Sequence, residues 1–560
     1  MAASSTPGWP HCRQGAASDD SFGCRGRRVD PYAECLAHLT DTDRAVYLAG
    51  LQPGADIDHR GTRLTTELLD ELLSTLKDPI SNRPQLGETW FQEAQFEGDA
   101  RFDLAQFGSS ARFDRAEFGG DASFTWAEFG KDAWFSGTQI SGNVQFDRAE
   151  IRLDAGFASV KIGGNAWFRA VKFGGEFRFH GAEIVGDVDL GESELERARA
   201  VGPLTCHGTL DFTQATFESA LTIEAATAVL RCERTRWAST ASLRLRYATV
   251  DLSDAVMEHP VSIVAHSRPF FTVRGPVAEP ELPDARARVA SLRGADAAHL
   301  TLINVDLTDC LFAGTTHLDQ LRLEGRYLLP LTPSGVRWRN WVPLRWTRRR
   351  TLAEEQHWRA ARGTTAGGWT SAPETVEVLE PTTLAPVYRQ LRKTFEDGKH
   401  EPGAADFYYG EMEMRRHADD IPWAERSLLA AYWAISGYGL RASRALGWLL
   451  LAMTATVLAM MLWGLPKDDP KPESTGTVDG QRISMTTDTA NPVNPDGPYR
   501  ERLSAGRFEK SLQVVINSVV FRSSGQELTT RGTYTEMLSR IGEPVLLGLA
   551  VLAVRGRIKR

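Results

Sequence analysis

The sequence lacks closely spaced cysteine pairs: its six cysteines, spread over 560 residues, include no CxxC motif. Such sparse usage excludes a small secreted domain held by disulfides and makes reduced, cytoplasmic thiols the expectation. The chain also lacks a strong net charge, and a formal charge of -8 gives no global sign of a nucleic-acid binder. The first residues have no basic start followed by an apolar run, so no signal peptide is predicted.

Catalytic motifs are missing as well. The chain has no nucleophile elbow, no Walker-type phosphate loop, no HExxH and no Rossmann glycine pattern. Glu411 and Glu413 lack an accompanying pattern of His, Ser or Cys, and we interpret them as solvated helix charge. We therefore expect a protein that is not an enzyme and that has no catalytic residues and no cofactor.

Three cysteines and one histidine stand near the N-terminus. Thiolate and imidazole are preferred zinc ligands, which makes Cys12, Cys24, Cys35 and His38 weak candidates for a metal site. Their spacings, with 11, 10 and 2 intervening residues, match no zinc knuckle. The sequence alone therefore predicts no metal site, and buried or incidental thiols are the favoured interpretation.

The dominant feature is an eleven-residue repeat, A-x-F-x-x-A-x-F-x-x-x, in residues 91–190, where apolar positions recur at alternating steps of five and six. A helix, at about 100° per residue, would place these positions on opposite sides. In an extended chain residues two apart point the same way, so each A-x-F is one inward-facing pair. The phenylalanines expected in the core are Phe91, Phe96, Phe102, Phe107, Phe113, Phe118, Phe124, Phe129, Phe135, Phe146, Phe157, Phe168, Phe173 and Phe179.

These units resemble those of pentapeptide-repeat proteins, in which each A-x-[LF]-x-x unit forms one side of a square, right-handed β-helix. The resemblance implies a mainly β fold, a quadrilateral solenoid. The extra residue in every second unit predicts coils of 22 residues instead of 20, with a bulged corner twice per coil. Glycines between the units are expected where the chain turns sharply.

The remaining chain divides into parts of different character. The expected parts of the N-terminal region are a helical cap (1–87), the β-helix (88–265), a protruding loop (266–290), final coils (291–330), and a basic, Trp-rich segment with a linker (331–383). Arg and Trp together suit either nucleic acid or an anionic membrane surface, and the apolar segments that follow favour the membrane. Residues 384–444 are expected to form a cytoplasmic helical hairpin and an interfacial helix.

The C-terminal region carries long apolar segments. Residues 445–465 contain no charge and are long enough to cross a bilayer. Arginines precede this span and an acidic flank follows it, so the positive-inside rule places the N-terminal domains and the C-terminus in the cytoplasm of a multi-pass membrane protein. The further parts expected are an extracytoplasmic loop (466–507), a re-entrant or interfacial helix (508–521), a second transmembrane helix (537–554) and a basic tail (555–560).

Two spans with a short helix between them resemble the pore domain of two-helix potassium channels, whose filter reads T-x-G-Y-G. The corresponding loop here has Arg522, Ser523, Ser524 and Gly525, of which only the glycine agrees, so a plain two-span anchor is favoured over a pore. The order of parts resembles that of multi-domain pentapeptide-repeat membrane proteins of actinobacteria. That resemblance implies a fold and a location but no activity.

Three functions stay open at this point. The favoured one is a membrane-anchored cytoplasmic scaffold that binds a protein partner on its solenoid. Outward positions of residues 88–190 hold 17 acidic and 10 basic side chains, a modestly acidic surface. The alternatives are a pore-like or mechanosensitive channel and, by resemblance to pentapeptide-repeat proteins that protect gyrase, an acidic DNA mimic. The expected partners are a lipid membrane and a protein, with homo-oligomerisation through the membrane region left open and no nucleic acid expected.

Overall fold

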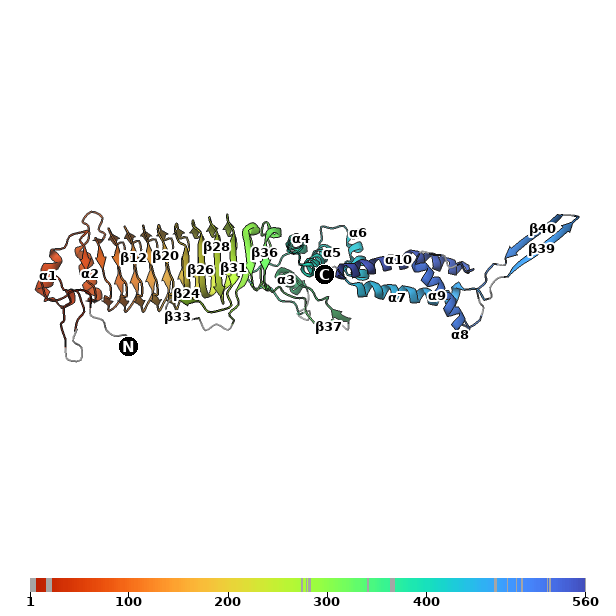
Figure 1. Cartoon of the computed structure of the whole chain (residues 1–560), viewed down its shortest axis with the longest axis horizontal. Helices are drawn as coiled ribbons and strands as arrows, with labels where there is room; N and C mark the ends of the chain where they lie inside the picture. The colour runs from red at the N-terminus through yellow and green to blue at the C-terminus, as the bar shows by residue number, and fades with distance from the viewer. Residues whose placement is uncertain are drawn as a thin grey trace. The chain divides into compact units, whose positions relative to one another are not determined.

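The computed structural model describes most of the chain (Figure 1). The described residues are 7–16, 23–272, 275–277, 279, 284–339, 342–362, 368–467, 471–480, 482–489, 491–494, 497–520, 522 and 525–558. They form two compact units, the first comprising Met1–Leu379 with Pro386–His400, the second Glu380–Ala385 with Glu401–Arg560. Each unit is described by itself.

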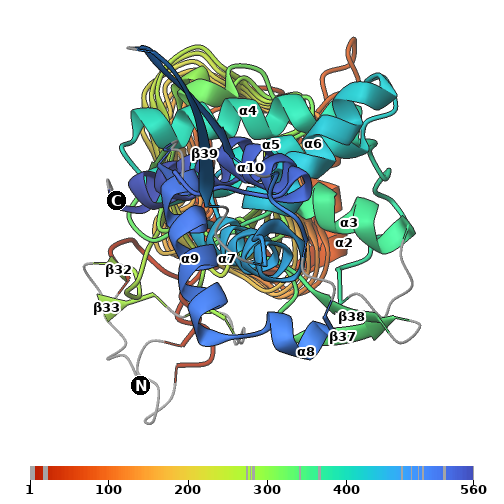
Figure 2. The same ribbon diagram turned by 90° about the vertical axis from the view of Figure 1, so that its right-hand side faces the viewer.

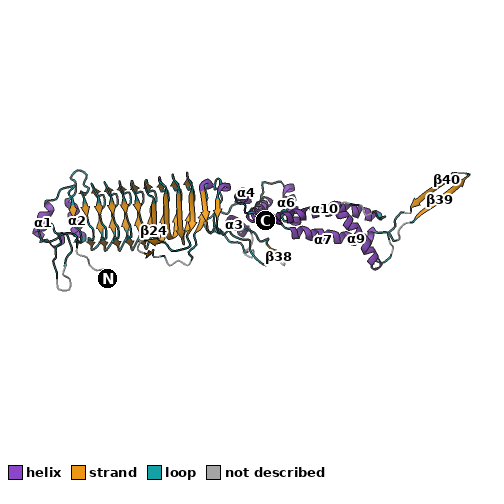
Figure 3. Ribbon diagram, viewed as in Figure 1, coloured by secondary structure: helices purple, strands orange, loops and turns teal. Residues whose placement is uncertain are grey.

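The first unit is dominated by a β-solenoid of about 11 turns built from pentapeptide repeats, which confirms the predicted fold class. Successive coils lie behind one another when viewed along the stack (Figure 2), and the stacked strands stand out in orange in Figure 3. The strands pair in parallel with those of the next coil. The strand backbones are therefore paired along the stack with those of the neighbouring coils, and no isolated repeat could supply these partners.

The solenoid strands fall into three parallel sheets. The six-stranded sheet contains β1 (Ile57–Asp58), β4 (Thr89–Trp90), β8 (Ala111–Arg112), β12 (Ala133–Trp134), β16 (Ala155–Gly156) and β20 (Phe177–Arg178). The nine-stranded sheet contains β3 (Gln85–Leu86), β7 (Gln106–Phe107), β11 (Glu128–Phe129), β15 (Glu150–Ile151), β19 (Lys172–Phe173), β23 (Glu194–Leu195), β25 (Thr216–Phe217), β27 (Arg236–Trp237) and β30 (Val256–Met257). The 19-stranded sheet contains β2 (Arg63–Leu64), β5 (Gln95–Phe96), β6 (Ala100–Arg101), β9 (Glu117–Phe118), β10 (Ala122–Ser123), β13 (Gln139–Ile140), β14 (Val144–Gln145), β17 (Lys161–Ile162), β18 (Ala166–Trp167), β21 (Glu183–Ile184), β22 (Val188–Asp189), β24 (Ala200–Asp211), β26 (Leu221–Arg231), β28 (Ala241–Arg246), β29 (Thr249–Asp251), β31 (Val261–Ala265), β34 (Arg288–Ser291), β35 (Leu300–Ile303) and β36 (Arg322–Glu324).

The solenoid core consists of stacked phenylalanine rings. All fourteen phenylalanines expected inside are at most 3% exposed. Phe102 and Phe124, one coil apart, are typical: their ring centroids lie 5.0 Å apart and their planes differ by 2°. Burial of one such side chain contributes about 1.5–3 kcal/mol, so the stacked rings are a large source of stability for the solenoid.

Coil length changes along the stack. Ala122 pairs with Val144, 22 residues further on, which confirms the predicted coil length in this part of the chain. Ala241, by contrast, pairs with Val261, 20 residues further on. The change takes place in the pairing of β24 with β26, where the register shifts twice, between Val201 and Leu204 and between Cys206 and Thr209. The two extra residues are thus lost one at a time, at separate corners.

The glycines have a different role from the one expected. The left-handed backbone conformation occurs in the five-residue corners, at residues such as Leu104 (φ 61°) and Trp126 (φ 59°), which are not glycines. Gly137 and Gly181 adopt the same conformation there, with φ of 72° and 71°, but the glycines of the six-residue corners are required because a neighbouring group of the preceding coil comes close. A Cβ atom at Gly142 would lie 2.2 Å from Oδ1 of Asp121, since that oxygen accepts a hydrogen bond from the backbone N–H of Asn143.

This contact recurs in every coil of the stretch and forms a ladder. In each step a side-chain oxygen accepts the backbone N–H that lies one coil further on, at 2.6–3.0 Å. We call its acceptors the Asx ladder: Asp99, Asp121, Asn143, Asn165 and Asp187. The extra residue in each six-residue corner leaves a backbone N–H group outside the strand pairing. The Asx ladder supplies the hydrogen-bond acceptor for that group.

The helical cap predicted over residues 1–87 is shorter in the structure, because part of this region already belongs to the solenoid. It holds η1 (Leu36–His38), α1 (Asp41–Ala49) and α2 (Thr66–Thr75), but β1 already pairs with β4 and β2 with β5. Residues 57–64 therefore belong to the first coil and not to a separate helical cap. Thr65 caps α2, since its Oγ1 accepts a 3.2 Å hydrogen bond from the backbone N–H of Leu68.

At the other end, polar groups close the last coil. The elements there are η2 (Ala297–His299), η3 (Leu318–Gln320), β37 (Val336–Arg339), β38 (Val342–Arg345), α3 (Ala353–Arg362) and α4 (Pro381–Asp397), whereas β32 (Phe271–Thr272) and β33 (Gly275–Pro276) form a hairpin in the loop before the final coils. Glu354 of α3 accepts the backbone N–H groups of Phe312 and Ala313 through Oε1, at 2.5 and 3.0 Å. Thr394 of α4 donates a 2.7 Å hydrogen bond to the carbonyl of Leu318. Such contacts cover an open solenoid end.

The second unit is mainly helical. Its elements are α5 (Glu401–His417), α6 (Trp423–Ser436), α7 (Ala442–Ala459), the π-helical η5 (Met460–Gly464), β39 (Pro472–Asp479), β40 (Arg482–Thr489), α8 (Tyr499–Arg502), α9 (Ala505–Val519) and α10 (Thr530–Ile558). Among the described residues, two helices are long and apolar enough to cross a membrane, Ala442–Gly464 and Thr530–Val554. Both are longer than the predicted spans. The loop expected over 466–507 contains an antiparallel hairpin, β39 with β40.

Candidate metal centre

Short stretches of backbone pairing hold the N-terminal cysteines. The segment that carries Cys12 pairs with the one that carries Cys24: the N–H of Cys12 donates to the carbonyl of Gly26 at 2.9 Å, and that of Cys24 to the carbonyl of Gln14 at 2.9 Å. Cys35 directly precedes the 3-10 helix η1, and His38 ends it. Residues three apart in a 3-10 turn lie above one another, which places Cys35 and His38 on the same side.

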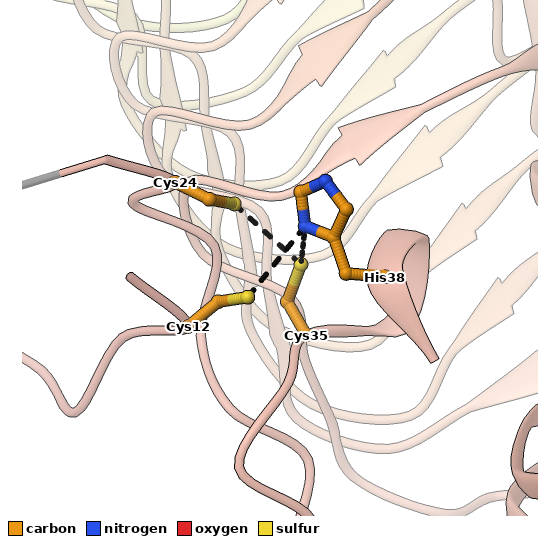
Figure 4. Close-up of side chains that lie close together, drawn as sticks. All are labelled: Cys12, Cys24, Cys35 and His38. Carbon is orange, nitrogen blue, oxygen red and sulfur yellow. Dashed lines mark hydrogen bonds between the residues drawn. The ribbon is translucent and has the colours of Figure 1, made fainter. Parts of the chain in front are cut away.

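The four side chains converge on one point (Figure 4). Their ligand atoms, three Sγ and one nitrogen of His38, all lie within 4.8 Å of one another. The Sγ atoms of Cys24 and Cys35 are 3.7 Å apart. Nδ1 of His38 lies 3.4 Å from Sγ of Cys35 and 3.6 Å from Sγ of Cys12.

The surroundings favour a thiolate in this cluster. The hydrogen bond from Cys35 lowers the pKa of the Cys24 thiol to about 5, with a further contribution from the backbone N–H of Gly26, which lies 3.4 Å from Sγ of Cys24. The same hydrogen bond, together with burial, raises the pKa of the Cys35 thiol. Thiolates are the form of cysteine that binds metals.

From the sequence alone these four residues were weak candidates for metal ligands, and no metal site was predicted. The intervals before Cys24 and before Cys35 match no known motif. Backbone pairing between the segments that carry Cys12 and Cys24 brings these two residues together, and their separation along the chain does not reveal it. The one local signal was the C-x-x-H of Cys35 and His38, the spacing that a single 3-10 turn requires.

The other three cysteines are solitary. Cys206, Cys232 and Cys310 are each buried within the solenoid. Burial raises the pKa of Cys206 to about 11, and it also raises the pKa values of Cys232 and Cys310. They are apolar core residues and not members of a site.

Two further groups of residues named from the sequence can be placed. Glu411 and Glu413 are 2% and 4% exposed, so their interpretation as solvated helix charge is wrong. Glu413 accepts a 3.1 Å hydrogen bond from the hydroxyl of Tyr438 and pairs with Arg416. In the filter-like loop, Arg522 and Gly525 follow α9, whereas Ser523 and Ser524 lie outside the described residues.

The fold and its core define the chain as a β-solenoid protein with an appended helical unit. Comparison with family models agrees: residues 102–150 match the model described as pentapeptide repeats (9 copies). That match lies within the 22-residue coils. No curated protein matches the chain, and neither does any solved structure.

Proposed function

We propose that the protein is a non-catalytic scaffold, anchored in a membrane by α7 and α10, whose solenoid binds a protein partner on the cytoplasmic side. The observation that carries the proposal is the exposure of the two apolar helices. Only 33% and 28% of their most apolar windows are buried, whereas a core helix of a soluble protein is mostly buried. Leu450 and Leu451 of α7 are 67% and 59% exposed, and Leu538 of α10 is 73% exposed. Surfaces of this kind require lipid or another apolar partner.

The inner faces of the two helices support the same proposal. Gly464 and Gly532 approach so closely that a Cβ atom on Gly532 would lie 2.3 Å from the carbonyl oxygen of Gly464. Thr456 donates a 2.9 Å hydrogen bond to Oε1 of Glu543, which is 1% exposed. Small residues at a close crossing and an inward-facing carboxylate with a polar partner are typical of helix pairs in membranes.

The solenoid surface suits protein binding. A shallow groove of about 360 Å³ crosses β26, β28 and β31, and it is lined by residues that include Thr222, Ser242 and Ser262. These three residues occupy equivalent positions in successive coils. A regular row of small hydroxyl side chains beside apolar ones offers hydrogen bonds without the cost of ordering long side chains.

Charge pairing favours a scaffold over a DNA mimic. Acidic residues such as Asp99 and Asp121 accept backbone hydrogen bonds within the Asx ladder. Others pair with bases one coil away, as Lys161 does with Glu183 at 2.8 Å. A mimic of duplex DNA needs a row of unneutralised negative charge, whereas here basic side chains neutralise part of the acidic surface.

Photocrosslinking in intact cells tests the proposal. A photoreactive amino acid replaces Ser242 in the groove, and the control replaces Ile483, which is 72% exposed on β40. We expect the Ser242 variant to capture one protein reproducibly in the membrane fraction and the Ile483 variant not to capture it. Identical captures from both positions, or a soluble full-length chain, would contradict the proposal.

A further inference from the structure

We propose that Cys12, Cys24, Cys35 and His38 bind one structural zinc ion, which fastens the N-terminal segment over the first coil of the solenoid. The inference is independent of membrane anchoring. It starts from geometry: a tetrahedral zinc ion, with Zn–S distances of about 2.3 Å and Zn–N of about 2.0 Å, requires about 3.8 Å between sulfurs and about 3.5 Å between sulfur and nitrogen. The Sγ atoms of Cys24 and Cys35 are 3.7 Å apart, and Nδ1 of His38 lies 3.4 Å from Sγ of Cys35 and 3.6 Å from Sγ of Cys12. The remaining pairs of ligand atoms lie within 4.8 Å.

The ligand set selects the metal. Three thiolates and one imidazole are soft and borderline ligands, which suit zinc and disfavour calcium or magnesium. Four protein ligands fill a tetrahedral shell and leave no position for substrate, so the site is structural and not catalytic. The N–H of Gly26 points at Sγ of Cys24, a contact that stabilises a thiolate ligand.

A disulfide accounts for less of the arrangement. It would join Cys24 to Cys35 and leave Cys12 and His38 directed at the same point without a reason. Gly26 adds to this argument, because a Cβ atom there would lie 2.8 Å from both Cβ and Sγ of Cys35. The backbone at Gly26 is therefore packed tightly against the side chain of Cys35.

The metal would hold the N-terminal segment against the first coil of the solenoid. The ligand-bearing segment contacts the first coil through the backbone N–H of Arg27, which donates to the carbonyl of Arg60 at 2.7 Å, and through an ion pair of Arg27 with Asp58 at 3.2 Å. Among the described residues of this segment, 7–16 and 23–39, the buried apolar side chains besides the ligand Cys35 are Val29, Leu36 and Leu39. A segment with so small a hydrophobic core needs a further source of stability, and a bound metal can supply the missing folding free energy.

Metal analysis of the full-length chain tests the inference. The protein is purified in detergent under reducing conditions from cells supplied with zinc, and its zinc content is measured by mass spectrometry. We expect one zinc ion per chain, and none in Cys24→Ser or His38→Ala. The matched control, Cys206→Ala, removes a solitary buried thiol and should retain the zinc.

Two further measurements guard against misfolded variants. Wild-type protein exchanged into cobalt should show the absorption of tetrahedral, thiolate-bound cobalt, which no unfolded solenoid would produce. Removal of zinc by a chelator should accelerate tryptic cleavage after Arg27 at least on the order of tenfold, with the circular dichroism of the solenoid unchanged. Folded wild-type protein that binds neither zinc nor cobalt, or that contains a Cys24–Cys35 disulfide and no metal, overturns the proposal.

Discussion

Asp121 and Asn143 stand one coil apart, and Oδ1 of Asp121 accepts a 2.7 Å hydrogen bond from the backbone N–H of Asn143. The same oxygen accepts a second hydrogen bond, at 3.2 Å, from the side-chain amide of Asn143. Substitution Asp121→Ala leaves both donors without this acceptor. We expect it to lower the free energy of unfolding by about 1–3 kcal/mol, as urea denaturation of the detergent-solubilised chain would show. Asp121→Asn keeps an acceptor oxygen and is the control; an equal loss in both variants contradicts the ladder.

The inward assignment of the phenylalanines leads to a second prediction. Phe124 is 0% exposed, and Phe124→Asp places an unpaired charge among stacked rings, at a cost of several kcal/mol. Trp126, two residues further on, is 46% exposed and lies beside Arg148, with the guanidinium 5.0 Å from its ring. Trp126→Asp should therefore change stability by no more than about 0.5 kcal/mol. Equal losses of stability in the two variants, measured by thermal unfolding, would contradict the inward assignment of Phe124.

A third prediction concerns pH and the buried carboxylate of Glu355. Burial alone would raise its pKa, but the charges of Arg349 and Arg359, together with hydrogen bonds from Arg349 and Tyr388, outweigh burial and lower the pKa to about 2. A carboxylate whose pKa is lower in the folded state contributes stability at neutral pH. That contribution is complete above the ordinary value of 4.5 and is lost as the pH falls toward 2.

Melting temperatures between pH 7 and pH 3 check this prediction. We expect Glu355→Gln to melt below the wild type at pH 7, because the side chain of Arg349, which is 2% exposed, then loses the opposite charge of Glu355. The difference between the two proteins should shrink as the pH falls below 4.5. Curves that stay parallel over the whole range would show that Glu355 does not carry this dependence.

The exposed face of α7 leads to a fourth prediction. Lysine at the centre of a membrane span costs about 2.5–3.5 kcal/mol per residue. The double variant Leu450→Lys, Leu451→Lys should therefore move the chain out of the carbonate-resistant membrane fraction. Ile483→Lys changes an equally exposed apolar residue outside the spans and should stay in that fraction. A double variant that fractionates like the wild type contradicts a lipid-facing role for this surface.

The sequence predicted best those parts in which the two-residue period of an extended chain determines which side chains face inward. In an extended chain the A-x-F pair can only face one way, so Phe102 and Phe124 could be placed inside without knowledge of any contact. The change to 20-residue coils could not be anticipated, since it depends on two register shifts within β24 and β26.

Sequence reasoning failed where a contact joins distant residues. Gly120 was expected to permit a sharp turn, but it is required by Asp99 of the preceding coil, whose Oδ1 would lie 2.4 Å from a Cβ atom at this position. The convergence of Cys12 with Cys24 depends on backbone pairing between their segments, and no spacing rule contains it. Glu413 was assigned to solvent because its partner Tyr438 lies 25 residues away on another element.

The central claim is a solenoid held at the cytoplasmic face of a membrane, and protease protection tests it most directly. One protease recognition site is inserted at Gly480, in the turn between β39 and β40, and in a second protein the same site is inserted after His417, at the end of α5. The account predicts that protease added outside intact cells cuts at Gly480 and leaves the site after His417 uncut until the membrane is permeabilised. Cleavage at both sites in intact cells, or at neither, would contradict it.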